Sequence, residues 1–264
     1  MTVAKTCRTV LTAGASLLLA NALITAAAAQ SASTVNSAAL VHGAWADGSS
    51  WSAVIPLLEG KGLHGVAVQN PLTSLADDVA ATKRAIAVED GPVILVGHSY
   101  GGAVITESGN DPKVAGLVYV AAFASGDGES VASISKPYPP APLGGELRPD
   151  AQGFLSVTAK GIAEDFGQDL SDNEKQILRA TQRPTHAAAF GATISTAAWK
   201  TKPSQSVIAG NDRAIPPELE KAEAATMKAQ SIIVPSSPAA MLSHPKQVAD
   251  LVEQSAAHAR SRQP

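Results

Sequence analysis

The hexapeptide Gly97-His98-Ser99-Tyr100-Gly101-Gly102 is the sequence feature that most restricts how this chain can fold. It follows an apolar run at 92–96 that is typical of a buried strand, and it precedes a segment that can form a helix. Glycines two residues before and two after the serine allow a strand and a helix to meet at a turn too tight for a Cβ atom. Such a turn strains the serine backbone and lifts its hydroxyl clear of the sheet. We therefore predict that Ser99 is a nucleophile and not an ordinary loop serine.

The rest of the chain alternates strand-like and helical segments, which predicts an α/β fold with a mostly parallel sheet flanked by helices. The expected strands are 35–41, 65–69, 93–96, 114–120, 205–208 and 231–234. The expected helices are 51–59, 75–88, 101–108, 218–228 and 245–257.

The segment 125–201 departs from this alternation. It begins with the Pro-rich run Lys136-Pro137-Tyr138-Pro139-Pro140 and then becomes mostly polar and helical. We expect a largely helical cap at this point, inserted into one α/β domain that spans 30–264. A flexible surface insertion is the alternative.

The first 29 residues have the pattern of a signal peptide. Lys5 and Arg8 precede an apolar run, and Ala27-Ala28-Ala29 provides the small residues that signal peptidase requires. We expect cleavage before Gln30 and export to the periplasm or the extracellular space, a retained amphipathic helix being the alternative. Cleavage removes the single cysteine, so no disulfide is expected in the mature chain.

The charge balance indicates the kind of partner. The chain has 20 basic and 23 acidic residues, and the leader holds two of the basic ones, which leaves 18 basic residues and a mature net charge of −5. No basic patch suggests nucleic acid or, after cleavage, a membrane surface. We expect a small-molecule substrate and neither a metal nor another cofactor.

A second motif, His42-Gly43-Ala44-Trp45, directly follows the first expected strand. Acyl transfer requires two backbone N–H groups directed at the oxyanion of the tetrahedral intermediate. The residue after the nucleophile, Tyr100, supplies one, and Ala44 is our candidate for the other because Gly43 permits a close backbone approach. By itself His42 could be a structural histidine.

The catalytic carboxylate is expected in the loop after the strand at 205–208. Asp212 stands there, in the chain order serine, acid, histidine. Its role would be to orient an imidazole and stabilise its cationic form. The alternative is a turn aspartate that pairs locally with Arg213.

Together these motifs resemble the α/β-hydrolase superfamily, specifically a bacterial group similar to plant methyl-ester esterases and hydroxynitrile lyases. The resemblance covers nearly all of the mature chain and rests on His42–Trp45 with Gly48-Ser49-Ser50-Trp51, on Gly97–Gly102, and on Asp212-Arg213 with Pro216-Pro217. It implies a cofactor-free serine hydrolase that acts on a small ester or lactone. The lyases place a threonine where this chain has Gly43 and a lysine after the catalytic histidine. Neither is present, which favours the esterase branch.

The general base departs from the pattern of this group. The resemblance implies a histidine about seven residues before the proline that opens the last helix, and Pro238 occupies that position. A pyrrolidine ring cannot accept the proton. His244 is the nearest histidine in sequence, and its alternative role is to flank a helix N-terminus. His186 in the cap is a weaker candidate. His42 and His98 should face away from Ser99, and His64 and His258 should lie on the surface.

Three classes of function remain open from the sequence. The first is an exported esterase or lactonase that uses Ser99, Asp212 and His244 or another base. The second is a pseudoenzyme that keeps the cavity and binds a small apolar ligand. The third is a lyase or cofactor-free oxygenase of the same fold.

Overall fold

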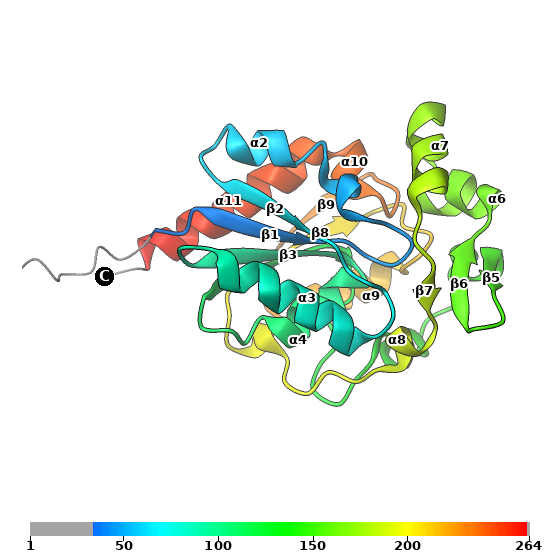
Figure 1. Cartoon of the computed structure of the whole chain (residues 1–264), viewed down its shortest axis with the longest axis horizontal. Coiled ribbons are helices and arrows are strands. Elements are labelled where there is room, and N and C mark those ends of the chain that lie inside the picture. Colours follow the sequence, from blue (N-terminus) through cyan, green and yellow to red (C-terminus); the bar gives the residue numbers. More distant parts are fainter. Residues whose placement is uncertain (1–33, 263–264) are drawn as a thin grey trace, which may run out of the picture. The chain divides into compact units, whose positions relative to one another are not determined.

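Six parallel strands form the central sheet of the computed structural model, which describes residues 34–262 (Figure 1). The strands are β1 (Ser37–Val41), β2 (His64–Val68), β3 (Val93–Ser99), β4 (Val114–Ala122), β8 (Ser204–Ala209) and β9 (Gln230–Val234). They lie in the order β2-β1-β3-β4-β8-β9, and every neighbouring pair is parallel. Each expected strand is present, with ends that differ by a few residues. The predicted fold class is confirmed.

Helices cover both faces of this sheet (Figure 1). α3 (Leu75–Val88) and α4 (Gly101–Ser108) pack on one face, and α2 (Ile55–Glu59) and α11 (Pro245–Ser261) pack on the other. Both faces of the sheet are apolar, and strand β3 is an example. Successive side chains of a strand point to opposite sides of the sheet. Val93 and Leu95 belong to the core under α3 and α4, whereas Ile94 and Val96 belong to the core under α11.

Local sequence signals fix most helix ends. The Ser74 side chain accepts a hydrogen bond from the Asp77 N–H and caps α3. Proline occupies the first turn of α9 (Pro217–Thr226) and of α11, where a missing N–H has no cost. The expected helix at 51–59 is instead a 3-10 turn, η1 (Gly48–Trp51), followed by α2. Pro56 lacks the N–H that a continuous helix would need there.

The segment between β4 and β8, for which we expect a largely helical cap, contains short helices and also a second sheet that was not predicted. β5 (Leu147–Pro149), β6 (Phe154–Val157) and β7 (Thr185–His186) pair antiparallel, at one end of the domain in Figure 1. Gly153, at a φ of 85°, allows the turn between β5 and β6. The accompanying helices are α5 (Val131–Ser135), η2 (Pro142–Glu146), α6 (Ala159–Gly161), η3 (Ile162–Phe166), α7 (Asp172–Thr181), α8 (Ala188–Gly191) and η4 (Ala198–Lys200). We keep the name cap for residues 125–201.

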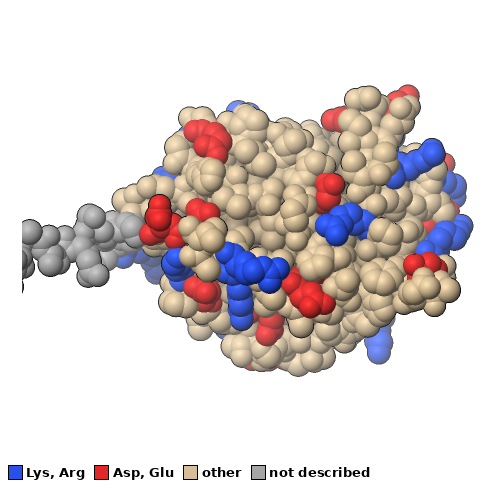
Figure 2. Space-filling model, viewed as in Figure 1, with Lys and Arg blue, Asp and Glu red and all other residues tan. Residues whose placement is uncertain are grey.

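The predicted signal peptide, residues 1–29, lies outside the described residues. Among residues 34–262 no helix is long and apolar enough to cross a membrane. On the face shown in Figure 2, acidic and basic side chains are interspersed.

Gly102 offers a direct test of how tightly α4 packs on the sheet. A Cβ atom at this position would lie 2.2 Å from the Phe123 carbonyl oxygen, which follows β4. We expect Gly102→Ala to lower the free energy of unfolding by about 1–3 kcal/mol, as overpacked cores do. Gly144→Ala is the matched control, because no atom of the described structure lies within 4 Å of its added methyl group. Urea unfolding measures both, and equal stabilities would contradict this packing.

Candidate active site

The turn between β3 and α4 holds Ser99 in a strained conformation. Its φ is 52°, in the left-handed region that few residues other than glycine adopt. The flanking glycines explain how the turn closes. A Cβ atom on Gly97 would lie 2.6 Å from the Gly101 carbonyl oxygen, and one on Gly101 would lie 2.5 Å from the Val41 carbonyl oxygen. Ser99 is 7% exposed and lines a cavity. The structure therefore places this hydroxyl where the sequence predicted it.

The loop after β1 lies directly against this turn. A Cβ atom on Gly43 would lie 2.8 Å from the Ser99 Cβ atom, so only glycine fits. The next backbone N–H along the loop is that of Ala44. Within residues 34–262 neither this N–H nor that of Tyr100 donates a hydrogen bond to the protein. Both N–H groups therefore lack a protein acceptor in the described structure, on the two segments that meet at Gly43 and Ser99.

Asp212 lies in the loop after β8, with only one of its two carboxylate oxygens in use. Oδ1 accepts hydrogen bonds from the N–H groups of Ala214 and Ile215, both 2.6 Å long. Oδ2 is buried and has no partner among the described residues. Burial raises the pKa of Asp212 to about 7. The alternative of a local pair with Arg213 is wrong, because the Arg213 guanidinium binds Asp165 at 2.6 Å.

Pro238 lies in the loop after β9, and its surroundings explain why its position matters. The Asn211 N–H donates to the Ser236 carbonyl at 3.0 Å, which ties this loop to the one that carries Asp212. On the other side, His98 Nε2 lies 3.0 Å from the Pro238 carbonyl oxygen. Burial lowers the pKa of His98 to about 4, so its ring is neutral and donates this bond. Pro238 is thus held between the acid loop and the nucleophile turn.

His244 is not brought to this site. It precedes α11, and its Nδ1 lies 2.9 Å from the Ser243 hydroxyl. Among the described residues it makes no hydrogen bond with Ser99 or Asp212, and it does not line the cavity. The expected catalytic role of His244 therefore has no support in this geometry.

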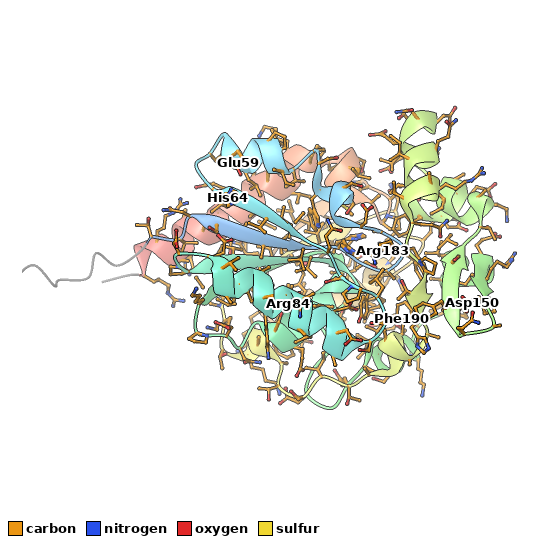
Figure 3. All side chains as sticks on the ribbon, in the orientation of Figure 1. Glu59, His64, Arg84, Asp150, Arg183 and Phe190 are labelled. Carbon is orange, nitrogen blue, oxygen red and sulfur yellow. The ribbon has the colours of Figure 1, made fainter. Side chains whose placement is uncertain are left out.

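The other histidines in question have separate structural roles. His42 Nδ1 lies 2.9 Å from the Gly43 carbonyl, its Nε2 accepts from the Asn70 N–H, and burial lowers its pKa to about 4. His186 Nδ1 accepts a hydrogen bond from the Ala188 N–H within the cap. His64 lies beside Glu59, away from β5–β7 (Figure 3).

Two buried carboxyl groups of α9, Glu220 and Glu223, were not predicted from the sequence. The Ala209 N–H donates to Glu220 Oε2, and the Ala124 N–H donates to Glu223 Oε1. Burial and then the Asp212 charge raise the pKa of Glu220, and burial raises that of Glu223 to about 8. Both lie on the buried face of α9, at the spacing of a hydrophobic stripe. Because a buried helix face is predicted from the spacing of its apolar residues, acidic residues at the same positions are not predicted to be buried.

The cavity at Ser99 is small and apolar. Its volume is about 290 Å³. The lining residues come from the body and the cap and are Trp45, Ser99, Phe123, Ser135, Pro139, Pro140, Ala141, Leu143, Gly144, Leu147, Phe190, Ala214, Ile215 and Pro216. Phe190 of α8 lines the cavity with its ring 5.7 Å from that of Trp45. Among these lining residues none carries a charge, so the cavity favours an uncharged apolar ligand.

Comparison with known proteins agrees with this architecture. The sequence profile described as "Alpha/beta hydrolase family" matches residues 39–251, and the chain belongs to that family. No curated protein sequence matches the chain significantly.

Several solved structures have the same fold. A pyrethroid hydrolase from Sphingobium faniae JZ-2 is 22% identical, with a TM-score of 0.72 over 85% of this chain and 98% of its own. Polyneuridine aldehyde esterase is 18% identical, with a TM-score of 0.71 over 84% of this chain and 99% of its own. An extracellular α/β-hydrolase from a Paenibacillus species is 18% identical, with a TM-score of 0.68 over 83% and 98%. The predicted resemblance is confirmed. At these identities the structures support the fold and not a shared substrate.

The buried carboxyl groups predict that stability falls as pH rises. An isolated glutamate titrates near 4.5, whereas folded Glu223 keeps its proton to about pH 8. Between these values the folded state binds more protons, so the free energy of unfolding decreases with pH. We expect Glu223→Gln to leave stability at pH 5 nearly unchanged and to raise it at pH 8 by about 1–3 kcal/mol.

Urea unfolding at both pH values measures this effect. Glu218→Gln, at an exposed position of the same helix, is the matched control. An equal response of the two variants to pH would show that burial of Glu223 does not govern the titration.

Proposed function

We propose that this protein is a slow hydrolase of small, uncharged carboxylic esters or lactones, which it cleaves through an acyl-enzyme on Ser99. The observation that carries the proposal is the strained Ser99 at the wall of an apolar cavity, beside the unpaired N–H groups of Ala44 and Tyr100. We also propose that the protein is exported after cleavage before Gln30.

The reaction has two balanced steps. The Ser99 hydroxyl oxygen attacks the ester carbonyl, and the N–H groups of Ala44 and Tyr100 stabilise the oxyanion. Collapse of the intermediate breaks the bond to the alcohol, which leaves with the proton that serine has lost. Water then attacks the acyl-serine and releases the carboxylic acid, which regenerates the Ser99 hydroxyl.

Proton transfer is the weak part of this mechanism. A triad histidine takes the serine proton and delivers it to the leaving group, with the aspartate fixing its orientation. At Pro238 the ring can do neither, so water must carry the proton. Loss of the histidine costs on the order of a million-fold in turnover in a serine hydrolase, while the oxyanion hole and binding retain about 10³–10⁴-fold over water. Esters with good leaving groups should therefore react best.

The lining of the cavity supports the substrate class. A volume of about 290 Å³ limits the ligand to a small molecule. The rings of Trp45 and Phe190 offer an apolar surface to an acyl or alcohol group. Two of the similar structures are named as ester-cleaving or pyrethroid-cleaving enzymes, which agrees with ester chemistry.

A ligand-binding protein without turnover is the second candidate, and Pro238 is the observation that favours it. The cavity and the backbone donors would still bind an ester, while the chemistry would stop before acylation. Covalent labelling of Ser99 separates the two functions.

We expect a fluorophosphonate to label the wild-type protein at Ser99, because phosphonylation needs the nucleophile and the oxyanion hole more than it needs an acid for the leaving group. Ser99→Ala should abolish labelling and keep the melting temperature, since the hydroxyl does not pack the core. Mass spectrometry of the intact protein gives the measurement. An unlabelled wild type would favour the binding protein, and a labelled Ser99→Ala would identify another nucleophile.

Restoring the base should accelerate turnover. We expect Pro238→His to raise kcat on a short-chain aryl ester at least about a hundredfold, because histidine bases in such sites contribute far more than that. Asp212 Oδ2 and the oxyanion donors would be ready for the new imidazole. Pro238→Asn is the matched control, which removes the ring without supplying a base.

The same assay examines His244. His244→Ala should leave the slow wild-type rate unchanged within about twofold. A fast wild type that His244→Ala inactivates would show that His244 is the base and that the weakened triad is wrong.

A further inference from the structure

The backbone of Trp45, which follows the proposed oxyanion donor Ala44, is held by the cap. Its φ of 57° lies in the left-handed region, which is unfavourable for a bulky side chain. The Trp45 N–H donates at 3.2 Å to the hydroxyl of Thr185, a buried residue of β7. This bond occupies the Trp45 N–H, whereas the neighbouring Ala44 N–H donates no hydrogen bond among residues 34–262.

A second bond from the cap holds the same residue. The Trp45 indole Nε1 donates to the Leu155 carbonyl of β6 at 2.9 Å. The strained backbone and the long side chain are thus fixed by two neighbouring strands of the cap sheet. A strained backbone conformation of this kind persists only where contacts with the surrounding structure hold it in place. Here the surrounding structure is the cap.

The other oxyanion donor connects to the same cap strand through buried Asp78. The Tyr100 hydroxyl donates to Asp78 Oδ2 at 2.8 Å, and the Leu72 N–H donates to Asp78 Oδ1 at 2.7 Å. The Leu72 carbonyl then accepts the N–H of His186, which directly follows Thr185, at 2.9 Å. Leu72 also has a positive φ, 59°. Tyr100, and Trp45 directly after Ala44, are therefore each linked by hydrogen bonds to β7.

We infer that β7 aligns the oxyanion hole, with Thr185 as the positioning residue for the Ala44 N–H and Asp78 for the Tyr100 N–H. The inference rests on the proposed function of Ser99 and adds a second role for the cap. The cap lines the cavity and also sets the direction of the two donors. Because these donors act on charge that develops in the transition state, their misalignment slows the chemical step and leaves binding unchanged.

The inactivation kinetics of Ser99 by a fluorophosphonate test this inference on the protein as it exists. Thr185→Val keeps the shape of the side chain and removes its hydroxyl, whereas Thr185→Ser keeps the hydroxyl. Removing an oxyanion donor outright costs about 10²–10³-fold, and a misaligned donor should cost less. We expect Thr185→Val to lower kinact about tenfold with KI unchanged, and Thr185→Ser to stay within about twofold of wild type.

Tyr100→Phe tests the second connection independently of any folding defect at position 185. It removes the bond to Asp78, and we expect kinact to fall several-fold with KI unchanged. A wild-type kinact in both Thr185→Val and Tyr100→Phe would overturn the inference while labelling of Ser99 still supports the hydrolase. A change confined to KI would also overturn it, because it would indicate a deformed cavity. An unlabelled wild type would overturn the proposed function and this inference together.

Discussion

The close backbone contact between the β1 loop and the nucleophile turn determines the geometry of the whole site. A Cβ atom on Gly43 would lie 2.8 Å from the Ser99 Cβ atom, and one on Gly101 would lie 2.5 Å from the Val41 carbonyl. The parallel pairing of β1 with β3 holds both segments in this position. A strained residue such as Ser99 costs about 1–3 kcal/mol, which only a rigid surrounding structure can sustain. The proposed nucleophile and oxyanion donors are therefore held by contacts that do not use the side chain of residue 238.

The acid side of the site shows the electrostatic consequence of Pro238. In a complete triad an imidazolium next to the aspartate would stabilise its charge. Here Asp212 Oδ2 has no partner in the described structure, and burial raises the pKa of Asp212 to about 7 against the hydrogen bonds that Oδ1 accepts from Ile215 and Ala214. A proton on these carboxyl groups lowers the cost of burying them. Burial of these acids thus makes the stability of the fold depend on pH.

The sequence predicted the features that depend on local patterns. The parallel sheet and the strained turn at Ser99 follow from strand periodicity and glycine spacing, whereas the roles of Ala44 and Asp212 stay predictions. The position of Pro238 could be counted from Pro245. By contrast, the cap sheet depends on long-range pairing of short strands, such as Phe154 with His186. The acidic residues of α9 are buried by tertiary packing. Because acidic residues are usually exposed, this burial could not be predicted from the local sequence. The bond from Trp45 to Thr185 joins residues 140 positions apart, which no local pattern indicates.

The loop after β9 explains how one side chain can alter the function of this fold. Its backbone is held on one side by Asn211 and on the other by His98, which binds the carbonyl of residue 238. Both contacts use backbone atoms of the loop, so they do not depend on the side chain that it carries there. Glycine contacts and sheet pairing hold the loops around this position in place. Proline or histidine at position 238 would therefore have the same proposed acid, nucleophile and donors around it. In the proposed mechanism these contacts specify where proton transfer takes place, and residue 238 determines whether it does.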